Sequence, residues 1–139
     1  MLELLAPAGN LDAVIAAVQN GADAVYMGFG DGFNARRSAD NFTRESFAKA
    51  VRYCHIRGCK VYVTLNTLVG DREMESAAAL AQQASDAGAD AILVQDLGLA
   101  RVLRDALPDI PLHASTQMSI HNLAGVEAAA EMGITRAVL

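Results

Sequence analysis

Asp96, His113 and Ser115 have side chains of the types that most often take part in catalysis. Asp96 directly precedes an apolar, helix-like segment that begins at Leu97, so its carboxylate can serve as a general base, as a metal ligand or as a helix N-cap. The position of Asp96 favours the cap. By residue type, Asp96, His113 and Ser115 are nevertheless the candidate catalytic residues, and no metal site is predicted.

His113 and Ser115 invite a base-and-nucleophile interpretation, because they project from the same face of one predicted strand. Two such positions lie roughly 6.6 Å apart, whereas a base must come within roughly 3 Å of its nucleophile. The spacing therefore favours a buried, hydrogen-bonded His113. The sequence also contains no His-Glu-x-x-His motif and no carboxylate suitably paired with Asp96, so no peptidase machinery is recognisable.

Polar residues that follow the predicted strands are candidates for substrate binding. They are Asn34, Arg36, Asn66, Gln95 and Gln117. Arg36 can clamp a carboxylate or phosphate, or it can hold its own long loop, 28–41, in place. Asn66 and Gln117 can bind a polar substrate, or they can satisfy each other across the end of the sheet.

Short β-rich runs alternate with amphipathic segments along the whole chain. Strands are predicted near residues 2–6, 23–27, 60–65, 90–94, 111–114 and 135–139. Helices are predicted near 11–20, 43–57, 71–87, 97–107 and 122–132, with Asn10, Thr43 and Asp71 at the first three helix starts. Glycine follows three of the helices, at Gly21, Gly88 and Gly133, as expected for helix C-termini.

Alternation within the strands favours a (β/α)₈ barrel of the TIM type over a doubly wound sheet. In residues 61–66, Val61, Val63 and Leu65 would face the helices, and Tyr62, Thr64 and Asn66 would face a polar interior. Six strands and five helices are fewer than a closed barrel needs. We therefore expect residues 1–139 to be the N-terminal part of one longer barrel domain, with a sheet edge through which this part can self-associate.

The composition excludes several classes of protein. The chain has 139 residues, a net charge of −5, and only two cysteines, Cys54 and Cys59, which we expect to be reduced. No apolar stretch is long enough to span a membrane, and the N-terminus lacks the basic start of a secretory signal, so a cytoplasmic location and no membrane partner are expected. No cluster of basic residues provides an obvious phosphate-binding surface.

Five segments together resemble the U32 family of peptidases in order and spacing: 3–10, 21–26, 33–36, 61–67 and 113–117. The resemblance implies a collagenase-like peptidase, with this part of the barrel inactive alone and the full-length protein an enzyme acting on peptide.

Similarity to members that hydroxylate a cytidine in ribosomal RNA, or act on transfer RNA, implies an alternative: an RNA-modifying enzyme whose substrates are RNA or a small anionic molecule. The family resemblance also places a cysteine-bearing segment, associated in some members with an iron–sulfur cluster, after residue 139, and leaves this part without a cofactor. A non-catalytic binding module is the third possibility.

Overall fold

The computed structural model describes residues 2–35 and 41–139. Its strands are β1 (Leu5–Pro7), β2 (Ala24–Gly28), β3 (Lys60–Leu65), β4 (Ala91–Val94), β5 (Leu112–Ala114) and β6 (Ile134–Ala137). Its helices are α1 (Leu11–Gln19), α2 (Arg44–His55), α3 (Met74–Asp86), α4 (Leu97–Ala106) and α5 (Leu123–Glu131), and a 3₁₀ turn, η1 (Thr116–Met118), follows β5. The predicted elements are all present, with boundaries shifted by up to a few residues.

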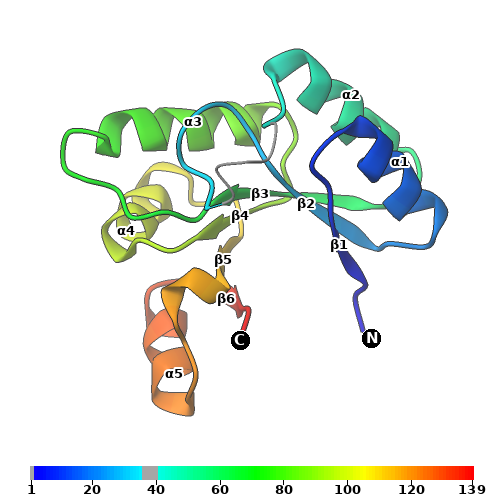
Figure 1. Ribbon diagram of the computed structural model, residues 1–139. Helices are drawn as coiled ribbons and strands as arrows, with labels where there is room; N and C mark the ends of the chain where they lie inside the picture. Colours follow the sequence, from blue (N-terminus) through cyan, green and yellow to red (C-terminus); the bar gives the residue numbers. More distant parts are fainter. Residues whose placement is uncertain (1, 36–40) are drawn as a thin grey trace.

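The six strands form one parallel sheet in the order β1-β2-β3-β4-β5-β6. Each strand pairs with the next one in the chain, whereas a doubly wound sheet changes direction at a switch point. Figure 1 shows the sheet curving, with the helices outside it and both chain ends on the same side. The predicted TIM-type (β/α) barrel architecture, with six strands and five helices, is confirmed.

Strand residues alternate between an outer apolar layer and the barrel interior. Val61 and Val63 pack in the outer core with residues of α1 and α2, and Leu65 packs in a second outer core with residues of α3 and α4. Tyr62 instead packs with Ala24, Ala91 and Leu93 in a small interior cluster. The predicted division of β3 into helix-facing and interior-facing side chains is therefore confirmed.

The side chains of Asn10 and Thr43 cap α1 and α2 by accepting backbone hydrogen bonds from Ala13 and Ser46. The predicted cap at Asp71 is wrong, because α3 begins at Met74, after a turn. In that turn the Glu73 carboxylate accepts a hydrogen bond from the Gly70 N–H at 2.9 Å, and the Glu73 N–H donates to the Gly70 carbonyl at 2.8 Å. These bonds hold residues 70–73 outside the helix.

The three repeated helix-to-strand junctions share one backbone conformation. Gly21, Gly88 and Gly133 have φ values of +88°, +99° and +80°, in the region that glycine adopts without strain. Cys54 and Cys59 are free, as expected, and both are buried. None of the helices within residues 2–35 and 41–139 is long and apolar enough to cross a membrane.

Candidate functional site

A pocket of about 260 Å³ lies at the carboxyl ends of the strands, and we call it the mouth pocket. Parallel strands bring their C-terminal ends to one rim, which is where barrels of this type place their binding groups. Its lining includes Tyr26, Thr64, Asn66, Leu93, Ser115 and Gln117. Asn66, Ser115 and Gln117 are thus brought together, as the sequence predicts.

Asn66 and Ser115 form the polar centre of the mouth pocket. The Asn66 side-chain amide donates to Ser115 Oγ at 3.1 Å, and Asn66 Oδ1 accepts a hydrogen bond from the Ala35 N–H at 3.0 Å. The Gln117 N–H also donates to Ser115 Oγ, at 3.3 Å. Among the described residues the Asn66 amide thus bonds Ser115 and Ala35 and not the Gln117 side chain, and Gln117 reaches Ser115 through its backbone.

His113 lies in the barrel interior toward the opposite end. It is buried, and it lines a second cavity of about 370 Å³ together with Lys60, Tyr62 and Arg136. Its ring packs edge-on against Tyr62 with 4.9 Å between ring centroids. The predicted burial of His113 is confirmed. The predicted hydrogen bond is not found among the described residues, and the His113 ring contacts the Tyr62 ring instead.

The pKa of His113 falls to about 4, first because burial disfavours the charged imidazolium and second because Arg136 repels it. The ring is therefore neutral at pH 7. Ser115 lines the mouth pocket and His113 lines the second cavity, so the pair faces two different spaces. This separation agrees with the strand spacing that argued against a base-and-nucleophile pair.

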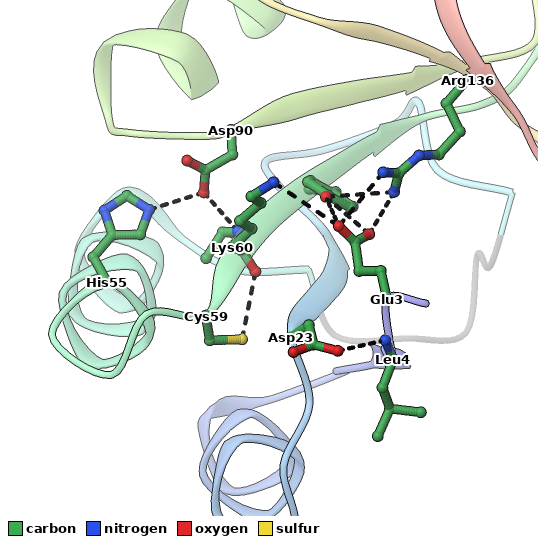
Figure 2. Close-up of polar contacts among 10 residues, drawn as sticks. Glu3, Leu4, Asp23, His55, Cys59, Lys60, Asp90 and Arg136 are labelled. Carbon is green, nitrogen blue, oxygen red and sulfur yellow. Dashed lines mark hydrogen bonds and ion pairs between the residues drawn. The ribbon is translucent and has the colours of Figure 1, made fainter. Parts of the chain in front are cut away.

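Glu3, Tyr62 and Arg136 form a polar network at the same end as His113. Figure 2 shows the Glu3 carboxylate turned toward the Arg136 guanidinium and Lys60. Arg136 pairs with Glu3, and the Tyr62 hydroxyl donates to the Glu3 carboxylate at 3.0 Å. The Arg136 hydrogen bond is the main cause of the lowered pKa of Glu3, and burial is the main cause of the raised pKa of Tyr62.

Asp96 caps α4. Its Oδ1 accepts a hydrogen bond from the Leu99 N–H at 2.8 Å, and its Oδ2 accepts one from the Val69 N–H at 3.3 Å. The cap favoured from the sequence is present, and the carboxylate also ties the loop after β3 to the start of α4. Its candidacy as a base stays a prediction.

Asn34 and Gln95 lie outside the mouth-pocket lining. The Asn34 amide donates to Asn41 Oδ1 at 3.1 Å, over the backbone of Gly28. Gln95 is half-buried after β4 and is not part of the mouth-pocket lining. Arg36 lies outside the described residues.

The described residues do not fit an iron–sulfur cluster. Residues 2–35 and 41–139 contain no group of three or more His, Cys, Asp or Glu side chains placed to bind a metal. Burial raises the pKa of Cys54 to about 12 and also raises that of Cys59, so both thiols stay protonated in the core. These cysteines are structural.

Sequence reasoning missed two contributors to these sites. The Ala35 N–H, which orients Asn66, is a backbone group in a loop and has no side-chain signal. The pairing of Glu3 with Arg136 joins residues 133 positions apart, which only the curvature of the sheet brings together. Opposite charges in the first and last predicted strands were the available signal.

The chain is similar in sequence to several known proteins. The chain is 41% identical over 99% of its length to the 23S rRNA 5-hydroxycytidine C2501 synthase of Escherichia coli, of which it covers 20%. It is 39% identical over 99% of its length to tRNA hydroxylation protein P1 of Bacillus subtilis, and 35% identical over 86% to a collagenase of Porphyromonas gingivalis. It covers 32% and 28% of these two proteins. The chain thus spans a fifth to a third of these curated relatives.

The solved structure of the U32 peptidase Mk0906 matches 99% of the chain with a TM-score of 0.80. The chain covers 57% of that structure, and at 16% identity the match shows the fold alone. The sequence model of peptidase family U32 matches residues 9–139, which is most of the chain, and on this match the chain belongs to peptidase family U32.

Proposed function

We propose that this chain supplies the substrate-binding part of a U32 enzyme that hydroxylates cytidine in RNA, and that the mouth pocket holds the target base. The observation that carries the proposal is the chemistry of the pocket. Its polar centre consists of the Asn66 amide and the Ser115 hydroxyl, which are hydrogen-bonded to each other. Neutral donors and acceptors of this kind read the edge of a base. Tyr26 and Leu93 add apolar walls against which a base can pack.

Peptide cleavage is the second candidate, favoured by the family's name and by the collagenase relative. The relatives carry both kinds of name, so they are compatible with either activity. In the described chain Ser115 Oγ is hydrogen-bonded by Asn66 and Gln117, while His113 lines a different cavity. The nucleophile or metal of a peptidase would therefore have to come from other residues.

Several further expectations belong to the full-length protein. We propose that an iron–sulfur cluster, if the enzyme uses one, is bound by residues outside this chain, because the buried Cys54 and Cys59 do not fit it. A cytoplasmic location is proposed because RNA is the substrate. The continuation of the barrel after residue 139, and self-association of this part through β1 or β6, stay predictions.

The two activities are separated by expressing the full-length protein in a strain that lacks its own U32 hydroxylation proteins. Mass spectrometry of nucleosides from ribosomal and transfer RNA should then show hydroxylated cytidine above the empty-vector level. The purified protein should leave gelatin uncut. Soluble protein that cuts gelatin and restores no hydroxylated nucleoside would reverse the assignment.

A further inference from the structure

The orientation of the Asn66 amide is fixed by its partners. The Ala35 N–H is a donor, so the group facing it at 3.0 Å must be the carbonyl oxygen of Asn66. The NH₂ group of Asn66 must then face Ser115 Oγ, at 3.1 Å. The direction of the hydrogen bond between Asn66 and Ser115 therefore follows from the loop backbone.

Ser115 receives two hydrogen bonds and is left with a proton to donate. A hydroxyl has two lone pairs and one proton. The Asn66 amide and the Gln117 N–H occupy the lone pairs, at 3.1 and 3.3 Å. No acceptor for the proton is present within residues 2–35 and 41–139, although Ser115 is only 3% exposed. A buried hydroxyl donor that lines the mouth pocket is therefore available to a ligand.

Thr64 provides the pocket with a hydrogen-bond acceptor, where Ser115 provides a donor. Its hydroxyl donates to the Met27 carbonyl at 3.2 Å, which leaves a lone pair of Thr64 Oγ1 as an acceptor in the same pocket. Thr64 lies on β3 and Ser115 directly follows β5, with β4 between these strands, so their backbones are two strand spacings apart, roughly 9–10 Å. The mouth pocket thus offers a ligand a donor and an acceptor from two different strands.

We propose that Ser115 donates a hydrogen bond to a carbonyl oxygen of the substrate, and that Asn66 is the positioning residue that fixes this direction. If the proposed function holds, this acceptor is the C2 carbonyl oxygen, the one carbonyl that cytosine has. Ser115 then contributes one hydrogen bond to the recognition of the base, and Asn66 acts through Ser115 without a contact of its own to the carbonyl.

Asn66→Asp tests the direction of the hydrogen bond with almost no change of shape. One carboxylate oxygen still accepts from Ala35, but the other now accepts the Ser115 proton, which turns the donor away from the substrate. For the full-length enzyme, we expect Asn66→Asp and Ser115→Ala each to lower kcat/KM for hydroxylation of substrate RNA about tenfold. The double variant should have a kcat/KM no lower than that of the less active single variant, because both changes remove the same hydrogen bond.

Gln117→Glu is the matched control for added negative charge. Gln117 reaches Ser115 through its backbone N–H, so this substitution leaves the Ser115 proton where it is. Any loss it causes should shrink at high salt, because screening weakens charge repulsion, whereas the Asn66→Asp loss should persist. Thermal melting of every variant separates these effects from unfolding.

RNA carrying 2-thiocytidine at the target tests the same hydrogen bond without any substitution in the protein. Sulfur is a weaker acceptor than oxygen, so the wild-type enzyme should prefer cytidine, and Ser115→Ala should lose most of that preference. Equal use of both RNAs by the wild type, or an undiminished preference in Ser115→Ala, would overturn the inference. Normal hydroxylation of RNA by both Asn66→Asp and Ser115→Ala would likewise overturn the inference, while leaving the proposed function standing. Loss of gelatin cleavage in Ser115→Ala would instead assign the carbonyl to a peptide.

Discussion

Glu3 and Arg136 meet across the barrel end opposite the mouth pocket, although 133 positions separate them in the chain. Glu3 precedes β1 and Arg136 lies in β6, the two outermost strands of the sheet. Figure 2 shows their side chains pointing toward each other. Tyr62, on β3, donates to the same carboxylate. These contacts link β1, β3 and β6 at this end of the barrel and so stabilise the curvature of the sheet.

Arg136→Ala should destabilise the full-length protein by about 1–2 kcal/mol, because it leaves the Glu3 carboxylate with Tyr62 and the more distant Lys60 as partners. Chemical denaturation measures the change. The effect should shrink as the pH falls below the ordinary pKa of a glutamate. The folded-state pKa of Glu3 is lowered, so the stability that the ionised carboxylate contributes is present above the unfolded value and is lost as the pH falls through the folded one.

Lys49→Ala is the control for this experiment. Lys49 forms an ion pair with Glu45 on the exposed surface of α2, and such pairs contribute little. Equal destabilisation by Lys49→Ala and Arg136→Ala would show that the Glu3–Arg136 contact does not hold the outer strands.

His113 should make the protein less stable in mild acid. Its folded-state pKa of about 4 lies below the ordinary value of 6.5, so the unfolded chain takes up the proton first as the pH falls. Its contribution is complete above pH 6.5 and is lost progressively toward pH 4, by roughly 3 kcal/mol at most. His113→Phe, which keeps a ring against Tyr62, should flatten this part of the stability profile. An NMR titration of the His113 ring with a midpoint near 6.5 would contradict the expectation.

Two substitutions at Asp96 separate its capping role from a role as a base. Asp96→Ala should cost about 1 kcal/mol, because the Leu99 N–H loses its cap. Asp96→Asn keeps an oxygen for that N–H, but its NH₂ group replaces the acceptor of the Val69 N–H, so it should lose part of the stability while retaining hydroxylation activity. A loss of activity of 100-fold or more in folded Asp96→Asn would instead identify a general base.

Gly28→Ala should disturb the loop beside the mouth pocket. An added Cβ would overlap the side chains of Asn34 and Asn41, which are joined at 3.1 Å. Both can move away, so the melting temperature should change little while kcat/KM falls by roughly 3- to 10-fold. Gly9→Ala is the control, because its added Cβ would have nothing within 4 Å. Equal activity of the two variants would separate this loop from the site.

Local patterns were enough to predict the order of elements and the inward-facing side chains. Alternation placed Tyr62 and Thr64 inside the barrel, and the glycines at 21, 88 and 133 marked the helix ends. The start of α3 was missed because Asp71 has the right residue type for a cap, while Glu73 makes the competing contact with Gly70.

Contacts between distant segments were beyond these patterns. Asn66 was identified as a rim residue, but its orientation depends on the N–H of Ala35, a loop backbone group. Likewise, the burial of His113 was predictable from its strand, whereas its contact with Tyr62 depends on the parallel pairing of β3 with β4 and of β4 with β5. Three-dimensional placement of backbone groups was the missing information.

Hydrogen–deuterium exchange of the full-length protein, with and without its substrate RNA, tests most directly whether the mouth pocket holds the substrate. RNA should slow exchange in peptides covering residues 64–67 and 115–118, which carry the mouth-pocket residues, and leave those covering 60–62 and 134–136 unchanged. Protection confined to the Glu3–Arg136 end, or bound RNA with no protection at residues 64–67 and 115–118, would contradict the assignment.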